Sequence, residues 1–176
     1  MQKKVIVVRY GHRPVRDERV TSHCCLVARA FGAEKIIIAG NEDTGLKNSI
    51  HNVTQKWGND FNLEFTPHWK NTIQKLKKQG FTILHLTMYG LPIDSLKNII
   101  KKTGKLVLVI GSKKVEKEMF EISNYNVSIT NQPHSEIAAL TIALDKIFQG
   151  RELQYQRKKA KLKIIPSTRR KIVKKI

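Results

Sequence analysis

The chain has 176 residues, with 33 Lys or Arg against 14 Asp or Glu, so its formal net charge at pH 7 is +19. This length suits one domain with its own core, and the charge indicates a polyanionic partner, most often nucleic acid, or else a lysine-rich solvated surface. Two adjacent cysteines, Cys24 and Cys25, exclude a disulfide framework, and no apolar run reaches membrane-span or signal-peptide length, so we expect a reduced, cytoplasmic protein.

The first residues predict a β-loop-α-β unit. A buried strand is expected at Lys3–Tyr10, because its centre is a continuous β-branched run. A polar loop, Gly11–Arg19, follows it. The pattern then predicts a helix over Val20–Phe31 and a second buried strand over Glu34–Ala39. This order is typical of an open α/β sheet.

The rest of the body alternates in the same way. Helices are predicted at Asn48–Trp57, Trp69–Gln79, Ile93–Lys102, Glu116–Ser123 and Ile137–Phe148, and strands at Phe61–Thr66, Thr82–Leu86, Leu106–Ile110 and Tyr125–Ile129. About six strands alternating with helices favour a mostly parallel sheet covered on both faces. We expect this α/β domain to span residues 1–150.

Residues 151–176 have a different character. Eleven Lys or Arg stand there against one acid, Glu152. β-branched residues on both sides of the turn Pro166–Arg169 favour a basic β-hairpin over a disordered tail.

Polar loops follow three of the later strands, at Leu86–Gly90, Ile110–Lys114 and Ile129–Pro133. The carboxyl ends of parallel strands lie along one sheet edge, where a crevice commonly holds the ligand. The third loop runs into a helix whose first N–H groups are unpaired and can bind a ligand. Ser135 or Asn131 can instead act only as the helix N-cap.

Other kinds of site are excluded by missing patterns. There is no glycine-rich nucleotide-phosphate motif, no Gly-x-Ser-x-Gly elbow, and no metal-ligand spacing among the six histidines. What remains is an uncharged or zwitterionic small ligand held largely by backbone groups, and no metal.

Four arginines stand close together early in the chain: Arg9, Arg13, Arg16 and Arg19. Guanidinium groups bind oxyanions bidentately, so this cluster suits phosphate or ribose recognition. The alternative is a surface loop in which Arg16 and Arg19 pair with Asp17 and Glu18. If a helix begins near Arg19, then Arg19 and His23 share one of its faces, which we expect to look toward the strand ends.

The stretches Arg9-x-Gly-His-Arg-Pro-x-Arg-Asp-x-Arg-Val-Thr-x-His23, Ala28–Ala33, Leu86–Gly90 and Asn131–Glu136 closely resemble one family. It is the archaeal tRNA cytidine-56 2′-O-methyltransferase family of the SPOUT superfamily. The resemblance covers essentially the whole chain. It implies a C-terminal trefoil knot at roughly residues 82–148, although an unknotted chain is the general expectation.

The family also implies a ligand, a substrate and a homodimer. The reaction is methyl transfer from S-adenosylmethionine to the ribose 2′-hydroxyl of cytidine 56 in the TΨC loop of tRNA. The resemblance places the cofactor in the knot loops, at Leu86, Gly111, Ser112, Lys113, Lys114, Val115, Ile129, Thr130, Asn131, Gln132, Pro133, His134, Ser135 and Glu136.

The chain departs from its relatives at two places. Lys113 and Glu116 stand near positions where the family usually has glutamate and proline. Related ribose methyltransferases carry an Asn-x₅-Arg motif, and Val20 and Leu26 occupy its two positions here.

The departures lead to a hypothesis about roles. Arg19 supplies the missing guanidinium, and His23 or Ser135 orients the ribose. Arg9, Arg13 and Arg16 contact RNA. Two alternatives remain: a SPOUT enzyme acting on another tRNA or rRNA nucleotide, and a non-catalytic basic RNA-binding protein, which explains the charge but not three converging loops.

Overall fold

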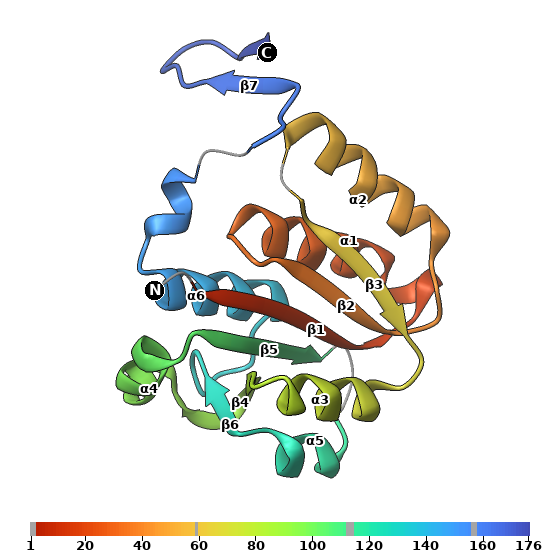
Figure 1. The fold of residues 1–176 in the computed structure, drawn as a ribbon, viewed down its shortest axis with the longest axis vertical. Helices are drawn as coiled ribbons and strands as arrows, with labels where there is room; N and C mark the ends of the chain where they lie inside the picture. Colours follow the sequence, from red (N-terminus) through yellow and green to blue (C-terminus); the bar gives the residue numbers. More distant parts are fainter. Residues whose placement is uncertain (1–2, 59, 112–114, 156–157) are drawn as a thin grey trace.

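A six-stranded sheet forms the body of the protein in the computed structural model, which describes residues 3–58, 60–111, 115–155 and 158–176. The strand order is β3-β2-β1-β5-β4-β6, and all neighbouring strands are parallel (Figure 1). The strands are β1 (Lys4–His12), β2 (Lys35–Gly40), β3 (Asn62–Thr66), β4 (Thr82–Pro92), β5 (Lys105–Gly111) and β6 (Tyr125–Ser128). The predicted parallel α/β sheet is confirmed.

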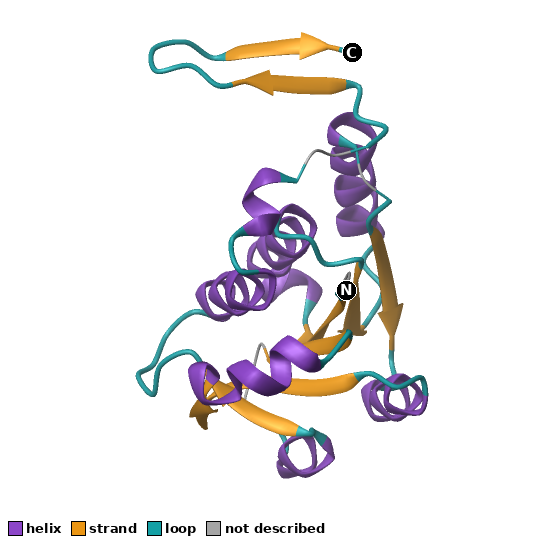
Figure 2. Cartoon of the chain, turned by 60° about the vertical axis from the view of Figure 1, so that its left-hand side comes forward, coloured by secondary structure: helices purple, strands orange, loops and turns teal. Residues whose placement is uncertain are grey.

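Helices cover both faces of this sheet (Figure 2). They are α1 (Pro14–Ala30), α2 (Thr44–Trp57), α3 (Trp69–Lys78), α4 (Lys97–Lys102), α5 (Lys117–Ile122) and α6 (Glu136–Phe148), with 3-10 turns η1 (Ile93–Leu96) and η2 (Arg151–Gln154). Strand residues such as Val7 and Leu108 pack with α1, α2, α4 and α6, whereas alternate residues such as Val8 and Val107 pack with α3 and α5. Burial on both faces explains why the central strands are continuously apolar.

Helix α1 begins at Pro14, so the prediction of a loop over Gly11–Arg19 was wrong. Proline suits the first helical position because its fixed φ is already helical and its missing N–H needs no partner. Asp17 then accepts hydrogen bonds from the backbone N–H of Arg13 (3.1 Å) and from its Nε (2.9 Å). The N–H of the residue that precedes the helix thereby has a partner.

Strand β4 does not end at Leu86 as predicted. It pairs with β6 on both sides of an excursion: Val127 is the partner of Leu86 and again of Leu91. Gly90 brings the chain back against β6 so closely that a Cβ there would lie 2.4 Å from the backbone N of Val127. Only glycine permits that approach. Residues 87–90 therefore bulge away from the pairing with β6 while still belonging to β4.

The C-terminal segment forms two antiparallel strands, β7 (Leu162–Ile165) and β8 (Ile172–Lys175). Figures 1 and 2 both show this hairpin standing apart from the sheet and its helices. Within the described ranges, no helix combines the length and the apolar character that crossing a membrane requires.

A buried histidine ties β4 to β6. His85 lies in β4 with 1% exposure, its Nδ1 is 2.8 Å from Asn126 Oδ1, and its ring meets Phe120 edge to face. Asn126 donates through Nδ2 to the Phe120 carbonyl, so its oxygen accepts and His85 Nδ1 is the donor. Burial lowers the pKa of His85 below its ordinary value of 6.5, so the folded protein holds this ring neutral.

A first prediction concerns stability against pH. The unfolded chain takes up the His85 proton at a higher pH than the folded chain, so this contribution to stability is present above the unfolded pKa and is lost as the pH falls below about 6.5. In urea unfolding at a series of pH values, His85→Gln should show a shallower loss of stability toward acid than the wild type. The exposed His51→Gln in α2 controls for the substitution itself. Equal slopes for His85→Gln and the wild type would contradict the assignment.

Candidate active site

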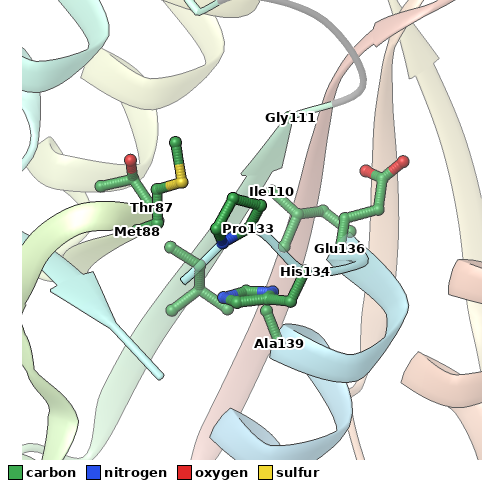
Figure 3. A pocket seen from close by; sticks show the side chains of 9 residues that line it. Thr87, Met88, Ile110, Gly111, Pro133, His134, Glu136 and Ala139 are labelled. Carbon is green, nitrogen blue, oxygen red and sulfur yellow. The ribbon is translucent and has the colours of Figure 1, made fainter. Parts of the chain in front are cut away.

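A cavity of about 430 Å³ lies at the carboxyl ends of β4 and β5, beside the start of α6 (Figure 3). Three segments far apart in the sequence form its walls: Leu86, Thr87 and Met88, then Ile110 and Gly111, then Pro133, His134, Glu136 and Ala139. The three strand ends singled out in the sequence thus meet at one cavity, whose volume is typical of small-molecule sites.

Some of the predicted cofactor residues line this cavity and others do not. The lining includes Leu86, Gly111, Pro133, His134 and Glu136. Ile129, Thr130, Asn131, Gln132 and Ser135 belong to the same loop but are not among the lining residues. The side chain of Val115 packs on the other face of the sheet, against the cluster around α3 and α5, and Val115 is not among the lining residues, so its contact with the cofactor stays a prediction. Ser112, Lys113 and Lys114 lie outside the described residues.

Four lining residues are absent from the predicted cofactor contacts: Thr87, Met88, Ile110 and Ala139. The first three nevertheless lie in the strand-end loops that were expected to meet. The first two belong to the loop that was recognised as polar, but which of its side chains turn inward depends on the β4 excursion. Ala139 follows Glu136 by three residues on α6, so the two share a helix face. That spacing was the available signal for Ala139.

Asn131 joins two walls of the cavity. Its Nδ2 donates to the carbonyl of Met88 at 2.6 Å and approaches that of Gly90 at 3.4 Å. The side-chain amide therefore holds the 87–90 excursion against the loop that follows β6. Ser135 has the capping role: its Oγ accepts from the N–H of Ile137 at 3.1 Å at the start of α6.

A buried ion pair lies under the third wall. Arg9 in β1 has 0% exposure, and its Nη2 donates to Glu136 Oε1 at 2.9 Å. The expectation that Arg9 contacts RNA was wrong, because a guanidinium buried between β1 and α6 cannot reach a phosphate. Figure 3 shows the Glu136 carboxylate on the side of the cavity away from Thr87 and Met88. Burial raises the pKa of Glu136, while the Arg9 charge acts in the opposite direction.

The other predicted arginines lie outside the cavity. Arg13 forms a two-pronged pair with Asp17, Nε to Oδ2 at 2.9 Å and Nη2 to Oδ1 at 3.1 Å, and this contact lowers the pKa of Asp17. The alternative expected Arg16 and Arg19 to pair with Asp17 and Glu18, but the partner of Asp17 is Arg13. Arg16 and Arg19 are both exposed on α1.

Arg19 and His23 share an exposed face of α1 and do not line the cavity of their own chain, so the expectation that this face looks toward strand ends stays a prediction. The apolar side of α1, with Cys24 and Ala28, packs on the sheet instead. Burying that side turns Arg19 and His23 outward. Among the residues that the structure describes, no three His, Cys, Asp or Glu side chains are grouped to hold a metal ion.

Comparison with known proteins assigns the family. The model of the family described as tRNA ribose 2′-O-methyltransferase, aTrm56, matches residues 57–174. The tRNA (cytidine(56)-2′-O)-methyltransferase of Thermococcus kodakarensis is 47% identical over 177 residues, covering 98% of each chain. That of Sulfurisphaera tokodaii is 49% identical and covers 93% of this chain and 98% of its own. This chain belongs to that family.

Solved structures show that this tRNA ribose 2′-O-methyltransferase has the SPOUT methyltransferase fold. The A. aeolicus TrmH/SpoU tRNA modifying enzyme aligns with a TM-score of 0.61 at 15% identity, covering 88% of this chain and 78% of that one. The SpoU methyltransferase AviRb from Streptomyces viridochromogenes, solved in complex with the cofactor AdoMet, aligns with a TM-score of 0.57 at 15% identity. That match covers 85% of this chain, which spans only 58% of the AviRb chain.

A second prediction concerns the Arg9–Glu136 pair. Arg9→Met should lower the free energy of unfolding by about 3–5 kcal/mol, because it leaves the Glu136 carboxylate buried without its partner. The double variant Arg9→Met with Glu136→Leu should recover much of that loss, since neither charge then remains. Chemical unfolding of the wild type, both single variants and the double variant gives the interaction free energy between the two side chains. Purely additive losses would show that the pair does not act as a unit.

Proposed function

We propose that this chain transfers the methyl group of S-adenosylmethionine to the ribose 2′-hydroxyl of cytidine 56 in the TΨC loop of tRNA, at the cavity between β4, β5 and α6. The family supports the reaction and its target. The observation that supports this location is the meeting of three strand-end segments at one cavity of about 430 Å³. A neighbour in fold is described with AdoMet, which is the same cofactor. We place the reaction in the cytoplasm, with the tRNA.

The lining of the cavity fits this cofactor. Leu86, Ile110 and Ala139 offer an apolar surface for the adenine ring, and Gly111 lets the backbone approach a ligand. Glu136 Oε2 is buried and has no hydrogen-bond partner among the described residues. A carboxylate oxygen left in this way can accept a hydrogen bond from the ammonium group of the cofactor's methionine part.

The protein has two tasks in the reaction. The bound cofactor supplies an electrophilic methyl group on a sulfonium. The enzyme must align the ribose oxygen with that methyl group and assist the departure of the hydroxyl proton. Arg19 suits the second task through its charge. A guanidinium stays protonated, so it stabilises the developing alkoxide and does not itself accept the proton. His23 and Ser135 are the candidates for orienting the ribose.

These roles require a homodimer. Arg19 and His23 face away from the cavity of their own chain, on an exposed face of α1. Val20 and Leu26 on α1, and Ile142 on α6, which packs on α1, are exposed apolar residues, with 37%, 37% and 42% exposure. A second copy packed on α1 and α6 covers these residues. It brings Arg19 of the partner subunit toward the cavity.

Two further arginines are assigned to the RNA backbone. Arg16 is exposed on α1, and Arg13 keeps a partly exposed guanidinium beside Asp17. Both fit phosphate contacts, for which the expected signature is a smaller salt dependence of tRNA affinity when either is removed. A non-catalytic RNA-binding protein would not bind S-adenosylmethionine, so calorimetric titration with the cofactor separates the two functions. Mass mapping of methylated tRNA separates cytidine 56 from any other target nucleotide.

A third prediction tests the cavity as the cofactor site. Ala139→Leu adds bulk at a buried lining position and takes space from the bound cofactor. If the resulting clash weakens binding by about 1–3 kcal/mol, as overpacking of this kind does in a core, the Kd for S-adenosylmethionine should rise roughly tenfold or more. Ala30→Leu adds the same atoms at the exposed end of α1 and should leave that Kd unchanged. Calorimetric titration measures both. An unchanged Kd for a folded Ala139→Leu protein would place the cofactor elsewhere.

A fourth prediction tests Arg19. Arg19→Ala should lower the methylation rate on tRNA by at least about 10²-fold, with little change in cofactor affinity, because the developing alkoxide then loses its electrostatic stabilisation. Glu18→Gln, which changes the adjacent exposed side chain by one charge, is the matched control and should turn over normally. Single-turnover rates with saturating cofactor make the comparison. Near-normal turnover of Arg19→Ala would remove this residue from the mechanism.

A further inference from the structure

The C-terminal hairpin carries a dense positive charge that the methyl-transfer site does not use. We call residues 158–176 the hairpin surface. Its nine Lys or Arg have no acidic residue among them in this segment. All nine are exposed: Lys158, Lys159, Lys161, Lys163, Arg169, Arg170, Lys171, Lys174 and Lys175.

Backbone contacts anchor this surface to the body. The N–H of Lys161 donates to the carbonyl of Lys56 at the end of α2, at 3.0 Å. Gly58 lies so close to the hairpin that a Cβ there would stand 2.4 Å from the Lys158 carbonyl oxygen. The hairpin therefore holds a fixed place against the α2–β3 connection.

The positions of two of these charges lower the stability of the hairpin itself. Lys163 and Lys174 are direct cross-strand partners. Like charges in that arrangement are destabilising, and a lone two-stranded hairpin is marginal in water. Lysines on edge strands also discourage aggregation, which is a competing reason for their presence.

Protection of the strand edges against aggregation does not explain the two arginines in the turn, which lie outside the strands. There the Ser167 hydroxyl accepts from the backbone N–H groups of Arg169 (3.3 Å) and Arg170 (3.1 Å). These bonds order the backbone of the turn, and the side chains of Arg169 and Arg170 are exposed there. Exposed guanidinium forks on an ordered turn suit oxyanions such as phosphates.

The hairpin and the cavity lie at opposite edges of the sheet. Lys56 and Gly58 precede the first residue of β3, whereas the cavity lies at the last residues of β5 and at residues 86–88 in the second half of β4. The seven residues of β5 span roughly 23 Å at ~3.3 Å per residue. The hairpin surface of one copy is therefore too far from its own cavity to touch the nucleotide bound there.

We propose that the hairpin surface binds the sugar–phosphate backbone of tRNA outside the T arm, the stem-loop that carries the methylated nucleotide. This inference rests on the proposed function for the identity of the RNA. A second copy of the chain is the other possible occupant, because Ile164 and Val173 are exposed on the hairpin. Charge favours RNA: a copy of this chain brings a net charge of +19 toward nine further positive charges.

A fifth prediction, on Lys163→Gln with Lys174→Gln, tests the proposal. Removing two facing like charges should leave the thermal stability of the protein equal or higher. A loss of tRNA binding in this variant would therefore not come from misfolding. Filter binding should show tRNA affinity weakened roughly tenfold, with the slope of log K against log salt smaller by roughly 1.5. In turnover, KM for full-length tRNA rises while kcat and the cofactor Kd stay unchanged. Lys101→Gln with Lys102→Gln, two exposed lysines on α4 at the other end of the molecule, is the matched control and should bind tRNA as the wild type does (Figure 1).

An isolated T-arm stem-loop provides the second substrate. Because the hairpin contact lies outside the T arm, the double variant should bind and methylate this short RNA as the wild type does. Equal losses on both RNAs, unchanged affinity for full-length tRNA, or a change in oligomeric state on light scattering would each overturn the proposal. If the wild type binds tRNA but does not methylate it, the proposed function fails, and the binding comparison still decides the role of the hairpin.

Discussion

The ion pair between Arg9 and Glu136 is the constraint on which the candidate active site depends. A fully buried guanidinium needs a buried anion, and the anion nearest to it stands on the first turn of α6. The pair therefore joins the central strand β1 to the last helix of the body. Because Glu136 also lines the cavity, the position of its third wall follows from a contact between residues 127 positions apart.

The first wall depends on backbone geometry. Gly90 allows β4 to leave and rejoin its pairing with β6, and Asn131 holds the resulting excursion through the Met88 carbonyl. Met88 and Thr87 come to the cavity only because of that excursion. Ser135 caps α6 through its hydroxyl, and the backbone of the loop between β6 and α6 reaches the same cavity beside Glu136.

The charges of this methyltransferase fall into groups with different environments. Arg9 is buried and paired with Glu136, Arg13 is paired with Asp17, and Arg16 and Arg19 are exposed on α1. The hairpin surface holds further positive charge at the other edge of the sheet. In the proposed mechanism, these exposed groups supply binding energy and alignment for a large polyanion, while the cavity itself needs little charge.

The sequence by itself determined the alternation of strands and helices, the parallel sheet and the three strand ends that share a cavity, because these follow from local periodicity and from the rule that parallel strands end at one edge. The motifs also identified the family. The knot and the division at residue 150 stay predictions. Tertiary structure decided what local patterns could not: that α1 begins at Pro14, that Arg9 is buried, that Val115 lies on the other face, and that Arg19 points outward. The reason is physical: whether a charged side chain meets solvent, a partner or a ligand depends on which face of its element the distant core covers, and sequence spacing does not record that choice.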